Sequence, residues 1–297
     1  MGTSVLKRNN FLLLHLIVLL WGATGIMGRE ITMTPTDIVW GRLAIAVITL
    51  WGFAIYTRQP LTLSHHERFP FVLGGMFIAG HWWTFFAAIK ASNITVPLTI
   101  LGSTSFFVSW FRPVVRDSRF NYHEFYLSIL ALSGLALALS LDVMNWHGVW
   151  LAIASSLLLA SFSLLNEQLV TQHQPLKVMF WELFFAALVT SFTSSFTSNG
   201  HFLKGISEPR NLILLVILGV VCTAFAGVIS IKVMQTISAF TYCLTKNLEP
   251  VYTITFAYFW YGESERMSSL FYLGGMVVLL SLGLDVLWKR FLSTSAR

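Results

Sequence analysis

A succession of long apolar segments constrains this chain more than any other feature of its sequence. Ten such segments follow one another, at residues 10–28, 36–56, 70–89, 94–114, 124–141, 147–167, 175–196, 211–233, 238–260 and 268–288. An apolar run of about 18 or more residues is long enough to cross the roughly 30 Å hydrocarbon core of a bilayer as a helix. The connections between the segments are short, so no separate soluble domain fits. The sequence therefore predicts an all-α integral membrane protein with ten transmembrane helices.

The composition agrees with burial in lipid. Of the 297 residues, 56% are hydrophobic and only 11% are charged, against roughly 25% charged residues in soluble domains. The net charge of +6 would suggest nucleic acid as a partner in a soluble protein. In a protein that crosses the membrane many times, the question is instead which side the basic residues face. We expect the lipid bilayer as partner and no nucleic acid.

The basic residues between the segments are distributed unequally. If the N-terminus lies inside, the inner side carries Lys7, Arg8, Arg58, Arg68, Arg112, Arg116, Arg119, Lys177, Lys232, Lys289, Arg290 and Arg297. The outer side then carries Arg29, Lys90, Lys204, Arg210 and Arg266. Because cytoplasmic loops are enriched in lysine and arginine, this bias predicts a protein of the cell (inner) membrane with both termini in the cytoplasm.

Weak self-similarity divides the chain into two halves. The segment PTDIVWGR, with Pro35 and Arg42, matches PLKVMFWE, with Pro175 and Glu182, at the start of the second and seventh predicted helices. We divide the chain into residues 1–143 and 144–297, with five helices each. An odd number of helices per half forces the two repeats to insert in opposite orientations. Inverted repeats place a substrate site near the bilayer midplane between the halves.

One motif carries a family resemblance. The stretch NLEPVYTITFAYFWYGE contains Leu248-Glu249-Pro250 and ends on Gly262-Glu263. It resembles the signature of the last two helices of the drug/metabolite transporter superfamily, in its EamA branch. The Trp21-Gly22 pair is also similar to that family. The resemblance implies ten helices in two inverted halves around a central cavity, and transport of metabolites such as amino acids, sugars, nucleotide sugars or drugs.

The first half departs from the family pattern. At the matching distance from the third helix it has Gly102, Ser103, Thr104 and Ser105, with no glutamate. A functional role of the family's glutamate can therefore be carried over to Glu249 alone.

Four ionisable residues lie within predicted spans: Arg42, Glu182, Lys246 and Glu249. Such a group costs about 2.5–3.5 kcal/mol to insert, so it normally faces a bundle interior or a wet cavity. Lys246 and Glu249 share one helix face and can pair. They either bind solute or form a structural ion pair, and Pro250, which frees a backbone carbonyl near Lys246, favours a site.

Arg42 and Glu182 occupy equivalent positions in the two repeats. Pseudo-symmetry would bring them to opposite walls of one cavity, with opposite charges that suit a zwitterion. The alternative is that both lie near helix ends and reach the headgroups or pair between helices.

Aromatic residues supply the remaining candidates. Trp83, in HWWTFF, and Trp21 and Tyr242 offer faces for an apolar or cationic part of a solute. The alternative is packing between helices or at the membrane interface. His15 and His81 either relay protons or are packed, and Glu249 is the candidate proton carrier.

The sequence therefore predicts a secondary active or facilitative transporter that acts by alternating access. The solute is a small metabolite, amino acid-like, zwitterionic or anionic, or a drug, and the energy comes from its own gradient or from coupled protons. The alternative is a membrane-embedded enzyme acting on a lipid-linked head group. No P-loop or H-E-x-x-H is present. We expect no cofactor, no metal, no disulfide between Cys222 and Cys243, and a monomer.

Overall fold

The computed structural model describes residues 2–92, 95–139, 145–197, 201–253 and 269–295, which are helical or connecting segments. In chain order the elements are α1 (Gly2–Glu30), α2 (Pro35–Tyr56), η1 (His65–Glu67), α3 (Arg68–Ala91), α4 (Thr95–Leu101), α5 (Thr104–Arg116), α6 (Tyr122–Leu139), α7 (Trp146–Leu169), α8 (Pro175–Thr197), α9 (His201–Ile206), α10 (Pro209–Ile217), η2 (Leu218–Phe225), α11 (Ala226–Met234), α12 (Ala239–Lys246) and α14 (Ser269–Ser295). The segment η1 is a 3₁₀ turn and η2 is a π-helix. The predicted all-α class is confirmed.

Local sequence signals set several helix starts. The hydroxyl of Thr34 accepts a hydrogen bond from the Asp37 N–H, and Pro35 occupies the first turn of α2. The side chain of Asn145 accepts from two backbone N–H groups at the start of α7. The side chain of Ser238 accepts from the Thr241 N–H at the start of α12. These caps satisfy backbone donors that have no partner within the helix.

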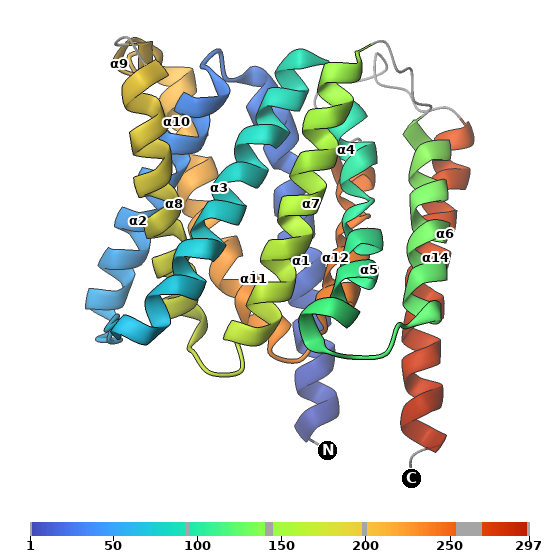
Figure 1. Cartoon of the computed structure of the whole chain (residues 1–297). Helices are drawn as coiled ribbons and strands as arrows, with labels where there is room; N and C mark the ends of the chain where they lie inside the picture. Colours follow the sequence, from blue (N-terminus) through green and yellow to red (C-terminus); the bar gives the residue numbers. More distant parts are fainter. Residues whose placement is uncertain (1, 93–94, 140–144, 198–200, 254–268, 296–297) are drawn as a thin grey trace.

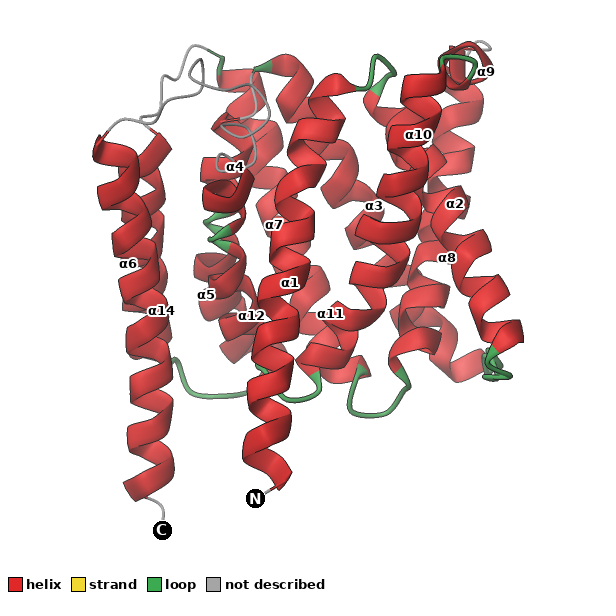
Figure 2. Cartoon of the chain, turned by 180° about the vertical axis from the view of Figure 1, so that it is seen from behind, coloured by secondary structure: helices red, strands yellow, loops and turns green. Residues whose placement is uncertain are grey.

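The helices stand side by side as one bundle (Figure 1). Helix α3 packs against α7 and α8, and α2 lies on the other side of α8. Helices α6 and α14 form a pair at one edge, which is clear from both sides of the molecule (Figures 1 and 2). Both chain termini lie at the same end of the bundle. We call this the terminus end and the other the opposite end.

Eight helical segments within the described residues are long and apolar enough to cross a membrane. Helices occupy the described parts of all ten predicted positions. Residues 122–138 form a shorter apolar helix, and the ninth segment is described only as far as residue 253. The predicted boundary between residues 143 and 144 lies outside the described residues, as do Gly262 and Glu263. The ten-helix count and the inverted repeat therefore remain predictions.

Two segments predicted as continuous are interrupted. The fourth breaks between α4 and α5, where the N–H of Gly102 donates to the carbonyl of Thr99 at 3.1 Å. The ninth breaks after α12, where the N–H of Leu248 donates to the carbonyl of Thr245 at 3.0 Å, and the helix resumes at Glu249. Pro250 has no N–H to continue the α-helical ladder back to Lys246. The predicted loosening before Pro250 is thus a full interruption.

The α6–α14 pair depends on close backbone contact. A Cβ atom added at Gly274 would lie 2.3 Å from the carbonyl oxygen of Gly134 and 2.5 Å from the N atom of Ala138. Small residues allow this approach, and van der Waals packing then holds two helices together in lipid. Gly283 lies on the same helix with no such neighbour within 4 Å of an added Cβ.

We expect Gly274→Ala to destabilise the protein by about 1–3 kcal/mol, because the new methyl group meets backbone atoms that cannot move aside. Gly283→Ala is the matched control and should stabilise by about 0.5–1 kcal/mol, the gain of alanine over glycine within a helix. Thermal unfolding of the purified variants in detergent measures both. Equal unfolding midpoints for the two variants would contradict the contact.

Candidate functional site

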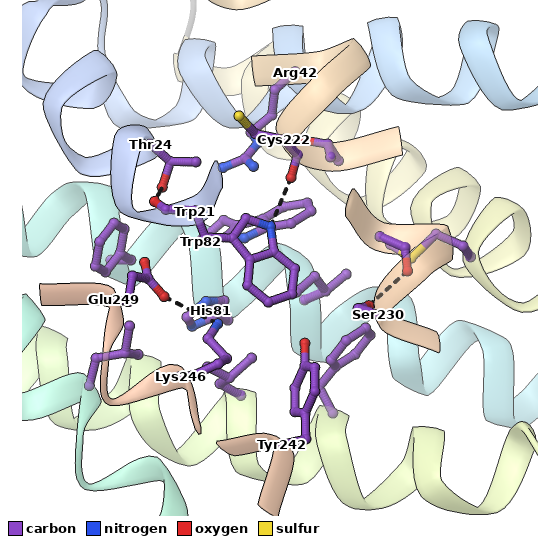
Figure 3. Close-up of a pocket in the computed structure, with 18 residues that line it drawn as sticks. Trp21, Thr24, Arg42, His81, Trp82, Cys222, Ser230, Tyr242, Lys246 and Glu249 are labelled. Atoms are coloured by element: carbon purple, nitrogen blue, oxygen red, sulfur yellow. Dashed lines mark hydrogen bonds and ion pairs between the residues drawn. The ribbon is translucent and has the colours of Figure 1, made fainter. Parts of the chain in front are cut away.

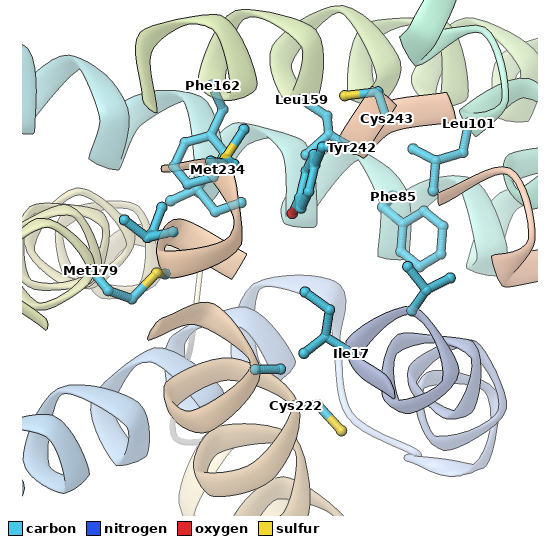
Figure 4. Packing of buried hydrophobic residues seen from close by; sticks show 14 of the residues in the cluster. Ile17, Phe85, Leu101, Leu159, Phe162, Met179, Cys222, Met234, Tyr242 and Cys243 are labelled. Atoms are coloured by element: carbon cyan, nitrogen blue, oxygen red, sulfur yellow. The ribbon is translucent and has the colours of Figure 1, made fainter. Parts of the chain in front are cut away.

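A small cavity, lined by charged, polar and apolar side chains, lies between the helices (Figure 3). Its walls come from α1, α2, α3, α4, α7, α8, η2, α11 and α12 and from Glu249 after the ninth-segment break. Apolar side chains fill part of the wall, including Phe85, Leu159, Phe162 and Met179 (Figure 4). The cavity volume is about 50 Å³, far below the roughly 300–1,000 Å³ of a site that holds an organic ligand. The described conformation is therefore contracted around the site.

Lys246 and Glu249 lie on either side of the helix break. Lys246 Nζ is 3.6 Å from Glu249 Oε2, and both side chains are at most 10% exposed. Lys246 is the last residue of α12, where the helix dipole favours a cation, and Glu249 begins the following helix, where it favours an anion. Glu249 Oε2 accepts no hydrogen bond from the described residues. The break thus stabilises both charges while leaving an acceptor in the cavity.

Arg42 supplies a second cation from α2. It is 2% exposed, and its Nε donates to the Thr223 hydroxyl at 3.0 Å. The guanidinium carbon lies 4.1 Å from the centre of the Trp82 ring, which is a cation–π geometry. None of the carboxylates in the described ranges lies within ion-pair distance of it. Arg42 is thus a buried, permanent charge without a carboxylate at ion-pair distance among the described residues.

The π-helix η2 provides the groups that Arg42 and Trp21 contact. The hydroxyl of Thr223 donates to the carbonyl of Leu218, five residues earlier, at 2.6 Å. The carbonyl of Cys222 accepts from the indole Nε1 of Trp21 at 3.0 Å. A π-helical turn displaces hydrogen bonds from the α-helical ladder, and such turns frequently occur at functional sites. No sequence signal in Leu218–Phe225 predicts it.

Aromatic rings enclose the two cations. Lys246 Nζ lies 4.4 Å from the centre of the Trp21 ring. Tyr242 meets Trp21 edge to face, with 6.1 Å between the ring centres. His81 also lines the cavity, and its Nδ1 lies 2.8 Å from the Ser155 hydroxyl. The wall therefore combines two cations, one carboxylate and aromatic faces.

Five of the predicted site residues line this cavity: Trp21, Arg42, Tyr242, Lys246 and Glu249. Two do not. Trp83 is 43% exposed and donates to the Thr36 hydroxyl, and its neighbour Trp82 lines the cavity instead. Glu182 is buried between helices, so Arg42 and Glu182 do not form opposite walls of one cavity. Arg42 contacts Thr223 and Trp82, whereas Glu182 contacts Asn166. Their equivalent positions in the two predicted repeats therefore do not bring them together.

A charged network that was not predicted from the sequence lies at the terminus end. Arg112 pairs with Glu124 and Glu167, at 3.1 Å each, and Arg116 pairs with Glu167 at 3.3 Å. Glu167 also accepts from the Ala239 N–H at 3.1 Å, so it caps α12. These residues border a cleft of about 700 Å³. In the sequence, Glu167 stands at the polar end of an apolar segment. That position does not show that it pairs with Arg112 and Arg116.

A second network at the terminus end joins η1 to α8. Glu67 pairs with Lys177 at 3.0 Å, and its Oε1 lies 3.5 Å from His173 Nδ1. Burial and the nearby Lys177 hold the pKa of His173 below its ordinary value, although Glu67 acts in the opposite direction. At neutral pH His173 is therefore uncharged, and Lys177 supplies the cation of the pair.

A bundle of membrane-spanning helices around a polar cavity is the arrangement of a membrane transporter. The model of the EamA-like transporter family matches residues 146–285. This second half of the chain therefore matches the EamA-like family, which is part of the drug/metabolite transporter superfamily. The resemblance predicted from the sequence is thereby confirmed.

Two further comparisons bear on the chain. A solved structure described only as a crystal structure of a protein superimposes with a TM-score of 0.74. The match covers 96% of this chain and 99% of that chain at 13% sequence identity, and at that identity it shows the fold alone. No curated protein matches the chain.

We expect the Lys246–Glu249 pair to stabilise the fold only as a unit. Either Lys246→Met or Glu249→Gln alone should destabilise by about 3–5 kcal/mol, because the remaining charge is buried and unpaired, whereas the double variant should lose less. Thermal unfolding of the three variants in detergent measures this. Arg210→Gln is the control, since it removes an ion pair with Glu30 whose arginine is 62% exposed, worth about 1 kcal/mol at most. Additive losses in the double variant would contradict the pairing.

Proposed function

We propose that this chain is a secondary transporter, active or facilitative, that moves a small metabolite with an anionic group through the central cavity by alternating access. The observation that carries the proposal is Arg42, a buried guanidinium with no carboxylate partner in the described chain. Lys246 is already matched by Glu249. The cavity therefore has one positive charge in excess, which a carboxylate or phosphate on the solute would neutralise.

The other wall groups narrow the solute class. Glu249 Oε2 lies 3.6 Å from Lys246 Nζ and accepts no hydrogen bond from the described residues, so an ammonium group on the solute could bind to it beside Lys246. The rings of Trp21, Trp82 and Tyr242 provide faces for an apolar part of the molecule. An amino acid-like zwitterion, or an anion with an apolar body, satisfies each of these groups at once.

Alternating access follows from the contracted cavity. A volume of about 50 Å³ requires the bundle to separate before an organic solute can enter. Contacts that join the two proposed halves, residues 1–143 and 144–297, lie at both ends. Arg112 and Arg116 hold Glu167 at the terminus end, and Thr32 and Glu30 hold Asn211 and Arg210 at the opposite end. Opening one set while the other stays closed would expose the cavity to one side at a time.

The topology belongs to the same proposal. We infer ten transmembrane helices in two inverted five-helix repeats, with both termini in the cytoplasm and a monomer as the working unit. The two ends of the chain lie at one end of the bundle, as an even number of crossings requires. The lipid-linked enzyme alternative needs a free acid and base at an interface. At the terminus end, Glu124 and Glu167 are instead paired with arginines.

The test is uptake into proteoliposomes of a mixed pool of amino acids, sugar phosphates, nucleosides and cationic drugs, read by mass spectrometry. We expect wild-type protein to accumulate at least one anionic or zwitterionic solute. Glu249→Gln and Lys246→Ala should abolish that uptake. Arg42→Gln should weaken binding about 10–100-fold, the loss expected for one charge-assisted hydrogen bond. Accumulation of cationic drugs alone would contradict the proposal.

Adjacent tryptophans provide a matched control. Trp82→Leu removes an aromatic wall of the cavity beneath Arg42, so uptake should fall. Trp83→Leu changes the same residue type one position along α3, outside the cavity, and should leave uptake near the wild-type level. Equal losses in both variants would indicate a defect in folding rather than in the site.

A further inference from the structure

A second buried carboxyl group lies away from the solute cavity. Glu182 of α8 has no exposed surface, and a Cβ atom added at Gly74 of α3 would lie 2.2 Å from its Oε1. The Asn166 amide of α7 donates to the same oxygen at 3.0 Å. Oε2 has no hydrogen-bond partner among the described residues. The carboxyl group is thus enclosed by three helices with one oxygen unsatisfied.

The ionisable groups on the elements around Glu182 do not neutralise it. They are Asp37 and Arg42 on α2, Arg68, His81 and Lys90 on α3, His147 and Glu167 on α7, Lys177 on α8, and Lys232 on α11. The described ion pairs include none between these groups and Glu182.

Three of these groups have other partners. Arg42 contacts Thr223. Glu167 pairs with two arginines, and Lys177 pairs with Glu67. A carboxylate ion at Glu182 would therefore be a buried, unpaired charge within the membrane, which is the most costly state for such a group.

We propose that Glu182 is a proton-binding site, separate from the solute site, which carries the coupling proton of the transporter. The inference rests on the proposed transport function. The step is proton transfer from water onto a carboxylate oxygen, with formation of one O–H bond and loss of the negative charge. In the conformation described here the site is occupied, and Glu182 is a neutral acid.

The position of Glu182 connects this proton to the movement of the halves. It lies where α3 of the first proposed half meets α8 of the second, and an added Cβ at Gly75 would lie 2.7 Å from the Glu182 carbonyl oxygen. Gly74 packs against the carboxyl group in the same contact, and Glu182 has no surface exposed to solvent. Loss of the proton would place a charge in the dry contact, so the two helices would have to separate and admit water. Proton release is therefore tied to opening of the α3–α8 contact.

The proton site and the solute site share the helices α3, α7 and α8, and α3 connects them most directly. His81 of α3 lines the solute cavity, and Gly74 lies about two turns earlier on the same helix. A displacement of α3 from α8 therefore moves a wall of the cavity. Coupling then needs no direct contact between proton and solute, because both sites bias the position of one element.

Infrared spectroscopy of the full-length protein in lipid nanodiscs tests the site directly, by the carbonyl stretching band of a neutral carboxyl group. At neutral pH we expect this band in the wild type, its loss in Glu182→Gln, and its retention in the control Glu249→Gln. Asn166→Leu should shift the frequency of the band, because Oε1 loses its donor. A wild type without the band, or a band that persists in Glu182→Gln, would overturn the proposal.

Stability against pH gives a second readout that does not depend on transport. A neutral Glu182 in the folded protein and an ionised one in the unfolded chain make the wild type lose stability as pH rises above the ordinary glutamate range. Glu182→Gln has the shape of the neutral acid and should lose less over the same range. Identical pH profiles would contradict the site.

The transport function and the proton site at Glu182 can be contradicted independently of each other. If solute accumulates but neither the band nor the pH difference is found, the proton site is wrong and the transport function stands. If both spectroscopic and stability signals appear while no solute accumulates, the proton site stands and the transport proposal is wrong.

Discussion

The buried guanidinium of Arg42 is the constraint on which the centre of the molecule depends. A guanidinium remains protonated inside proteins, so the surrounding structure has to solvate a permanent charge. Here the Thr223 hydroxyl and the face of Trp82 do so. Thr223 lies within the π-helical turn, and the carbonyl of Cys222 in the same turn accepts a hydrogen bond from Trp21. One charge thereby determines the local geometry of α1, α2 and α3.

The break in the ninth segment also stabilises buried charges, those of Lys246 and Glu249. Backbone groups outside a regular helix are tolerated at membrane depth only where protein or a cavity covers them. The turn at Asn247 and Leu248 is buried in the bundle, and its two flanking helix ends face the charges they favour. A continuous helix would supply neither the helix ends nor the accessible acceptor of Glu249.

Several features could be predicted from the sequence, and others depend on information that it does not show. Helix positions follow from hydropathy, and charges within apolar segments identify Arg42, Lys246 and Glu249 because such charges rarely face lipid. The direction in which a side chain points does not follow from hydropathy or charge. Trp82 and Trp83 are consecutive, so a rotation of about 100° about α3 separates the cavity residue from the exposed one.

The surroundings of Glu182 and of the Arg112–Glu167 network could not be predicted either, because they are formed by tertiary contacts. Which helix faces Glu182 follows from the glycines of α3, and Glu167 acquires its role only when α5 lies beside α7. The π-helix has no residue pattern of its own in Leu218–Phe225. These features arise from packing between segments distant in the chain, to which hydropathy and charge are insensitive.

The π-helical turn also bears on how the wall of the cavity could rotate. A π-helix closes its hydrogen bonds over five residues instead of four, so it holds one more residue in the same length. If that turn were converted to α-helical bonding, the residues of α11 would rotate by about 100° relative to α10. Gly227 and Ser230, which line the cavity on α11, would leave the wall, and their neighbours would replace them. In the segment that solvates Arg42, a change to α-helical bonding would therefore turn α11 about its own axis and alter the chemical character of one wall without tilting a helix.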